Sequence, residues 1–410
     1  MSTVLRAPRV RRILLAFTIN RLGSFAGMVA LLVLVYDHTH SALAVSSLLL
    51  AWQALPAFAV PPLVARVEAS PRGRELSGLY MFEAVVTTLM AVMASHFWLP
   101  LVLVLAALDG TAALAANALM RAALARAAAA EGEEGQTVDE QEANAALNVA
   151  FSTTFVLGPA LGGVIAASAG VSAALLLDVG TFLACAVLVV RLRTHVAEAG
   201  GDSVRARLTA ARDYVQRHVA LRKLLLVYAV ALALFEAAAP IEVAFAKSTL
   251  NAGDQGLGLL LTAWGGGAVL GSLLFARISE RPLALMLSVG TLGIGLADAG
   301  FALAPDLGLG CVAALVGGIG NGIELPALMG LVQDLAPPEM HGRLIGAVES
   351  LTALSLAVGL AGGGALVAAL SVRPAFAVVA VATVATAGML LRLAITARFK
   401  APASAVTENR

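Results

Sequence analysis

The residues most able to do chemistry in this chain are ionisable side chains that interrupt long apolar segments. They are Arg21, Glu83, Asp109, Asp178, Glu236, Glu242, Asp298, Glu324 and Glu349. In a hydrocarbon environment each charged side chain costs at least ~2.5 kcal/mol, so each one needs a partner, a wet cavity or a function. A carboxyl group in such a place can bind and release a proton, and a carboxylate can attract a cation. The pattern therefore predicts proton or cation chemistry at isolated acids.

Arg21 and Asp109 form the sharpest candidate pair. Counting along their apolar segments at 1.5 Å per helical residue predicts that both lie deep in a bilayer, where their side chains could meet. Burial disfavours the ionised form of Asp109, whereas a nearby arginine favours it, so the two effects oppose each other. A proton or another cation that competes with Arg21 for this carboxylate would displace the arginine, so that binding of one releases the other. The alternative is an inert structural ion pair.

The other polar groups in the apolar segments give weaker signals. Two amides, Asn20 and Asn117, can either form hydrogen bonds in a cavity or join helices by hydrogen bonds. All six histidines fall in loops or tails, so we expect no buried metal or haem site and no cofactor. We expect structural roles for the acids that mostly lie within two turns of a segment end, namely Glu83, Asp178, Asp298 and Glu349.

The composition places these groups in a membrane. Of 410 residues, 60% are hydrophobic and 13% are charged, and the mean hydropathy is +0.89, whereas soluble domains carry about 25% charged residues. Runs of about 20 apolar residues recur along the chain, each long enough to cross the bilayer as a helix. The first run, 13–35, is too long for a cleavable signal peptide. These features exclude a soluble enzyme and predict an all-α membrane protein.

The predicted organisation is twelve spans, six on each side of one long loop. The spans are 13–35, 43–66, 77–97, 100–122, 143–167, 172–192, 222–246, 256–276, 283–303, 309–332, 344–369 and 374–393. The expected parts are an N-terminal six-helix bundle at 1–193, a cytoplasmic linker with an amphipathic helix at 194–221, a C-terminal six-helix bundle at 222–393, and a cytoplasmic tail at 394–410.

The basic residues predict the orientation of the chain. Of the 27 Lys and Arg residues, 24 fall on one side of the predicted spans, two (Lys247 and Arg373) fall on the other, and Arg21 lies within a span. Because basic loops stay inside the cell, both termini are predicted to be cytoplasmic in a multi-pass protein of the inner membrane.

A glycine-proline segment in the fifth span predicts close helix packing. Gly158 and Gly162 lie four residues apart on one helical face, and Gly163 follows, so a neighbouring backbone can approach closely. We expect the facing helix to belong to the other half of the chain. Pro159 frees a carbonyl one turn earlier and permits a bend. Similar glycine spacing recurs at 359–364, which indicates two related halves.

These residues resemble the major facilitator superfamily, in particular its twelve-span drug-exporter branch related to macrolide and siderophore exporters, from about residue 9 to residue 392. The segment 158–163 is similar to a motif associated with antiporters of this superfamily. Gly271 to Arg277, with Arg281, resembles its cytoplasmic gating motif. The corresponding loop in the first half keeps Arg66 but lacks the Asp of the usual Asp-Arg pair.

The resemblance also implies a site and a function. Spans one, four, seven and ten are then expected to line a central cavity and to supply the substrate and proton pathway, namely Arg21, Asp109, Glu236, Glu242, Glu324, Asn20 and Asn117. The implied protein is a monomeric, proton-coupled antiporter that exports small amphiphilic compounds and confers drug resistance. It is not an enzyme and has no nucleic-acid partner. The surplus of acids favours cationic or neutral cargo. The alternatives are a nutrient importer, and a non-transporting sensor or scaffold with the same fold.

Overall fold

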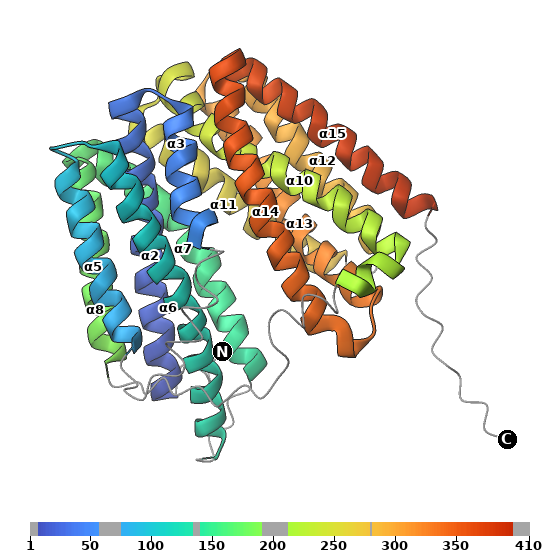
Figure 1. Cartoon of the computed structure of the whole chain (residues 1–410), viewed down its shortest axis with the longest axis horizontal. Coiled ribbons are helices and arrows are strands. Elements are labelled where there is room, and N and C mark those ends of the chain that lie inside the picture. The colour runs from blue at the N-terminus through green and yellow to red at the C-terminus, as the bar shows by residue number, and fades with distance from the viewer. Residues whose placement is uncertain (1–6, 57–74, 134–139, 191–211, 279–280, 397–410) are drawn as a thin grey trace. The chain divides into compact units, whose positions relative to one another are not determined.

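The computed structural model describes residues 7–56, 75–133, 140–190, 212–278 and 281–396, and their regular secondary structure is entirely helical (Figure 1). The helices are α2 (Pro8–Thr39), α3 (Ala42–Leu49), α5 (Glu75–Met93), α6 (Leu99–Glu133), α7 (Glu140–Ala169), α8 (Val171–Val189), α10 (Val219–Ala244), α11 (Gly253–Arg277), α12 (Leu283–Leu303), α13 (Leu307–Asp334), α14 (Pro338–Leu370) and α15 (Val372–Thr396). Two π-helical turns, η1 (Leu50–Ala54) and η2 (Phe245–Thr249), continue α3 and α10. The predicted all-α fold is confirmed.

Eleven of the described helices are long and apolar enough to cross a membrane. The second predicted span, 43–66, is described only through residue 56, within which Ala42–Ala54 forms a shorter apolar helix. Most helices extend beyond the predicted spans because the backbone stays helical where the apolar run has ended. The third span differs: α5 ends at Met93, four residues before the predicted end.

Polar side chains and special backbone conformations set several helix ends. The Ser41 side chain accepts a hydrogen bond from the Ala44 amide at the start of α3, and Asp306 accepts one from Leu309 at the start of α13. Both satisfy amides that have no partner within the helix. Gly170 joins α7 to α8 with a φ of +88°, a value that residues with a Cβ rarely adopt. Gly170 is therefore the single residue that connects α7 to α8.

The chain forms two compact units. Unit 1 comprises Met1–Ala199, Pro240–Gly265 and Gly363–Ala369, and unit 2 comprises Gly200–Ala239, Gly266–Gly362 and Leu370–Arg410. Three helices pass from one unit to the other at helix-breaking residues: α10 at Pro240, α11 at Gly265 and Gly266, and α14 within a run of glycines.

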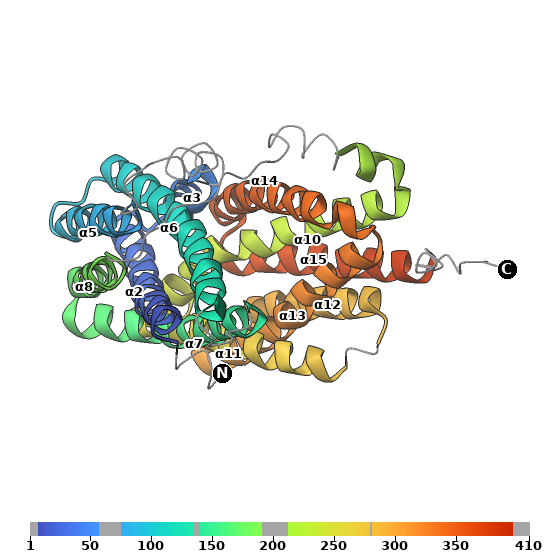
Figure 2. The same cartoon turned by 90° about the horizontal axis from the view of Figure 1, so that it is seen from below.

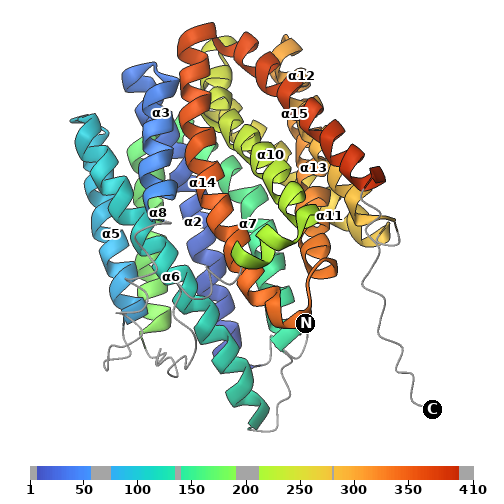
Figure 3. The same cartoon turned by 45° about the vertical axis from the view of Figure 1, so that its right-hand side comes forward.

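Within unit 1, α2 packs against α7 and α8, and α5 packs against α6 and α8, as Figure 3 shows. Within unit 2, α12 packs against α13 and α15 (Figure 2). Tyr80 stacks on Phe182 in the first core, and Phe301 packs against Phe376 in the second. Large apolar side chains are also strongly exposed, as at Val187, which is 73% exposed. Such outward apolar faces suit a lipid environment.

Candidate functional site

Arg21 projects from α2 into the interior of unit 1. Its Nη2 donates a hydrogen bond of 2.6 Å to Oδ1 of Asn117 on α6. Its guanidinium also lies over the rings of Phe17 and Phe151, 5.3 and 5.6 Å from their centroids. An arginine held by an amide and two aromatic faces keeps its charge while it is largely removed from water. Arg21 therefore joins α2, α6 and α7.

Asp109 has different partners from those predicted. It is 6% exposed on α6, and its Oδ2 accepts a 2.9 Å hydrogen bond from Nε1 of Trp52, which lies in η1. Its Oδ1 accepts a 3.3 Å hydrogen bond from the Thr87 hydroxyl on α5. The predicted Arg21–Asp109 contact is thus wrong for this conformation, because Asn117 binds the arginine and two neutral donors bind the acid.

One local signal in the sequence accompanies the Trp52 contact. Gly110 follows Asp109, and a Cβ at this glycine would lie 1.8 Å from the Trp52 carbonyl oxygen. The absence of a side chain lets η1 approach α6 closely enough for the indole to reach the acid. An acid-glycine pair within a span therefore indicated a close backbone approach, although it did not identify the partner.

The glycines of α7 divide between two neighbouring helices. Added Cβ atoms at Gly158 and Gly162 would meet α2, at 2.4 Å from Phe25 and 2.5 Å from the Ala26 carbonyl oxygen. The predicted close packing is confirmed, but the predicted partner in the other half of the chain is wrong for this pair. Gly163 does face that half: an added Cβ would lie 3.0 Å from the Cα of Gly258 on α11.

Pro159 contributes to the same contact between α7 and α11. Because proline has no amide hydrogen, the carbonyl of Phe155, four residues earlier, lacks its helical partner. That carbonyl oxygen lies against Gly265, 3.1 Å from where a Cβ would stand. The Pro159 carbonyl in turn lies against Gly258. A row of small residues on α11 thus accommodates the backbone of α7 around the proline.

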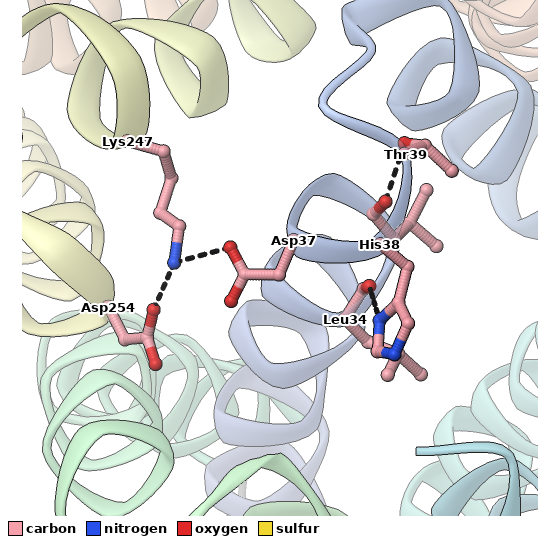
Figure 4. Close-up of polar contacts among 7 residues, drawn as sticks. Leu34, Asp37, His38, Thr39, Lys247 and Asp254 are labelled. Atoms are coloured by element: carbon pink, nitrogen blue, oxygen red, sulfur yellow. Dashed lines mark hydrogen bonds and ion pairs between the residues drawn. The ribbon is translucent and has the colours of Figure 1, made fainter. Parts of the chain in front are cut away.

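A charged triad in unit 1 links segments from both halves of the sequence (Figure 4). The Lys247 ammonium in η2 lies 2.7 Å from Oδ1 of Asp37, near the end of α2, and also binds Asp254 in the first turn of α11. The lysine side chain is 12% exposed, and those of Asp37 and Asp254 are 43% and 17% exposed. We predicted Lys247 on the outer side of the membrane but not its two acidic partners.

The three remaining predicted acids do not all lie in one unit. In unit 2, Glu324 is 5% exposed and its Oε1 accepts a 2.6 Å hydrogen bond from the Thr291 hydroxyl. Glu236, also in unit 2, packs its Cβ against Gly359 of α14. Glu242 belongs to unit 1 and is 9% exposed, and its Oε1 finds no hydrogen-bond partner within the described ranges.

The other predicted residues have simpler environments. Asn20 is 8% exposed in the core beside Arg21. Gly271 allows α11 to approach Ile319 of α13, because an added Cβ would lie 2.2 Å from the Ile319 carbonyl oxygen. Arg277 and Arg281 are exposed around the end of α11. Arg66, most of the linker 194–221 and most of the tail 394–410 lie outside the described residues.

Comparison with known proteins identifies transporters. The model of the Major Facilitator Superfamily matches residues 13–238 and 224–408. The multidrug efflux pump Tap of Mycolicibacterium fortuitum is 28% identical over 391 residues, which cover 92% of this chain and 93% of the pump. The MFS-type transporter YfiS of Bacillus subtilis (strain 168), described as uncharacterized, is 24% identical over 374 residues, 88% of this chain and 87% of YfiS.

Solved structures share the fold at low identity. The nucleoside transporter NupG aligns with a TM-score of 0.73 and 12% identity, covering 93% of this chain and 98% of NupG. A bacterial homologue of the iron transporter ferroportin, in an inward-facing state, aligns with a TM-score of 0.69 and 15% identity, covering 95% of this chain and 99% of that one.

Proposed function

Because this chain belongs to the Major Facilitator Superfamily, we propose that it is a proton-coupled exporter of small amphiphilic compounds, cationic or neutral, that works by alternating access. It is a multi-pass membrane transporter of small molecules rather than an enzyme, and multidrug efflux pumps are among its relatives at modest identity. The direction of transport, the coupling ion and the cargo class are the proposed part.

The environment of Asp109 is the observation that carries proton coupling. The acid is buried, and its hydrogen-bond partners, Trp52 and Thr87, are both neutral donors. An arginine in direct contact would hold the carboxylate in its charged form, whereas neutral donors leave both the protonated and the ionised forms accessible. A buried acid that can exist in both forms can take up a proton in one conformation and release it in another.

The acids of unit 2 support the choice of cargo. Glu324 is buried beside a hydroxyl group, and Glu236 lies partly buried on α10. None of the lysines and arginines whose burial is described in unit 2 is fully buried. A cation can therefore be attracted by these acids, whereas an anion would be repelled by them in a low-dielectric environment.

Location and orientation form a separate part of the proposal. The distribution of Lys and Arg supports a protein of the inner membrane with both termini in the cytoplasm. An impermeant thiol reagent applied to intact cells is expected to modify a cysteine placed at the exposed Ser248 but not one at the exposed Gln216. The opposite labelling pattern would invert the topology.

The direction of transport is tested by accumulation of a fluorescent amphiphilic cation in cells with and without the protein. Export predicts lower accumulation in the expressing cells, and addition of a protonophore should abolish the difference. Higher accumulation in the expressing cells would support import. No difference across a broad panel of cargos would support a sensor or scaffold.

A further inference from the structure

We propose that Glu83 is a second proton-binding carboxyl in the interior of unit 1, and that its proton and the Arg21 guanidinium exclude each other. This inference deepens the proposed function and rests on it for its purpose, since a second proton would belong to the same coupling machinery. Its physical basis is independent of cargo, because it concerns only the environments of two side chains, Glu83 and Arg21.

Glu83 is the most deeply buried acid in the polar interior of unit 1. It lies on α5, is 1% exposed, and its Oε2 has no hydrogen-bond partner in the part of the chain that the structure describes. A carboxylate oxygen that has lost water without gaining a donor disfavours the ionised form, whereas the neutral acid is tolerated. The environment therefore favours a bound proton on Glu83 in this conformation.

Glu83 shares this interior with other titratable and charged groups on four helices. Those that face it or its neighbours are Tyr80 on α5 itself, Asp109 on α6, Asp178 and Cys185 on α8, and Arg21 on α2, and the exposed Arg121 on α6 acts on Arg21. Three acids thus share the interior with one cation. Like charges in a low-dielectric environment disfavour simultaneous ionisation, so at least one of these acids has reason to stay protonated.

The other two acids of this cluster have donors that Glu83 lacks. Asp178 fits into a notch on α2 made by Gly23 and Gly27, where its carboxylate oxygens lie 2.6 Å from the position of an added Cβ, and it accepts a 3.1 Å hydrogen bond from Thr181. Asp109 is held by Trp52 and Thr87. Glu83 is therefore the acid with a free oxygen available for exchange.

Arg21 has the complementary free donor. Its Nη2 binds Asn117, but its Nε has no partner among the residues that are described. A rearrangement of α2 against α5 that brought the guanidinium to Oε2 of Glu83 would satisfy both atoms. The carboxyl would then lose its proton as the arginine arrived, and the released proton would lower the net charge of the interior by one, because Arg21 already lies there. The proton occupancy of Glu83 would thus follow the conformation of unit 1.

Infrared difference spectroscopy of the full-length protein in lipid vesicles can test this proposal without cargo or a pH gradient. A jump from acidic to alkaline pH should remove a protonated-carboxyl C=O band in the wild type. The band component should be missing in Glu83→Gln and retained in the matched control Glu349→Gln, since Glu349 is an exposed acid within a span. In Arg21→Gln the C=O band of protonated Glu83 should persist after a pH jump that removes this band from the wild type.

The outcomes separate this inference from the proposed function. A C=O spectrum of Glu83→Gln that superimposes on that of the wild type would overturn the proposal, as would an Arg21→Gln response identical to the wild-type one. Glutamine reproduces the shape and neutrality of a protonated glutamate, so failure of Glu83→Gln to fold would also contradict it. If the wild type showed the Glu83 band but no pH-driven efflux, that result would count against the proposed proton coupling at Asp109 and not against the assignment of Glu83.

Discussion

The interiors of the two units differ in how their buried acids are balanced. Unit 1 holds Glu83, Asp109 and Asp178 together with the guanidinium of Arg21. Unit 2 holds Glu324, which contacts a threonine hydroxyl, and its partly buried Arg373 donates to the carbonyl oxygens of Ala302 and Ala304. Acids that share an interior with a guanidinium can exchange partners within the unit, whereas an acid whose described partner is a neutral hydroxyl can attract a cation from outside. The first arrangement suits a proton switch and the second suits a cargo site.

The largest effect is expected where α7 packs against α11 in unit 1, the unit whose interior holds both acids and a guanidinium. Gly163→Leu should abolish transport, because even a Cβ would meet the Asp254 carbonyl oxygen at 2.8 Å, and overpacking costs ~1–3 kcal/mol or more. Gly180→Leu is the control, since nothing lies within 4 Å of a Cβ there. Efflux measured at matched expression should fall only in the first variant. Equal activity in both would defeat the packing argument.

The next effect concerns the cation that distinguishes unit 1 from unit 2. Arg21→Ala should slow transport by about 10- to 100-fold, because removing a charged hydrogen-bond partner from a buried site costs ~1.5–3 kcal/mol. Arg121→Ala, at an exposed arginine of α6, should stay close to wild type. Transport rates in vesicles check both. If the two variants transported at the same rate, Arg21 would have no special role in the interior of unit 1.

A smaller effect sharpens the role of unit 2. Glu324→Gln should lower efflux of a cationic cargo by about 10-fold, the equivalent of ~1.4 kcal/mol of lost attraction, and should leave efflux of a neutral cargo nearly unchanged. Glu349→Gln serves as the control. The measurement is competition between a cationic and a neutral substrate in the same vesicles. An equal loss for both cargos would make Glu324 structural.

The smallest effect is expected at the charged triad. Lys247→Gln leaves the two acids Asp37 and Asp254 facing each other. Solvent screens their repulsion because Asp37 is 43% exposed. The described conformation should therefore be destabilised by ~1 kcal/mol, which shifts its equilibrium with other conformations about five-fold. Maleimide labelling of a cysteine at the buried Leu34 should accelerate accordingly. Lys247→Arg should restore the slow rate, and unchanged labelling of the glutamine variant would remove the triad from the mechanism.

Hydropathy predicted the helices but not which faces meet. Gly162 and Gly163 illustrate the reason, because consecutive residues are about 100° apart around a helix. One therefore faces α2 and the other faces α11, and the sequence offered no way to fix that rotation. The pattern of small residues showed that close packing occurs, and the identity of each partner required the three-dimensional arrangement.

The candidate site was predictable in its residues and not in its contacts. Arg21, Asn117 and Asp109 stood out because polar groups are costly in a membrane, and all three make buried or partly buried polar contacts. The Trp52 contact depends on the π-helical turn η1, which hydrophobic periodicity cannot reveal. In the Lys247 triad, Lys247 and Asp254 are seven residues apart, but Asp37 is distant in sequence, so only the fold brings it to the other two charges.

The central claim is that Asp109, held by neutral donors, carries the coupling proton. The most direct measurement is efflux of an amphiphilic cation from proteoliposomes under an imposed pH gradient, comparing the wild type with Asp109→Asn. The asparagine variant is expected to bind cargo, as measured by equilibrium binding, but to lose the acceleration that the pH gradient gives the wild type. An asparagine variant with the full pH-dependent rate would contradict the claim and leave Asp109 with a structural role.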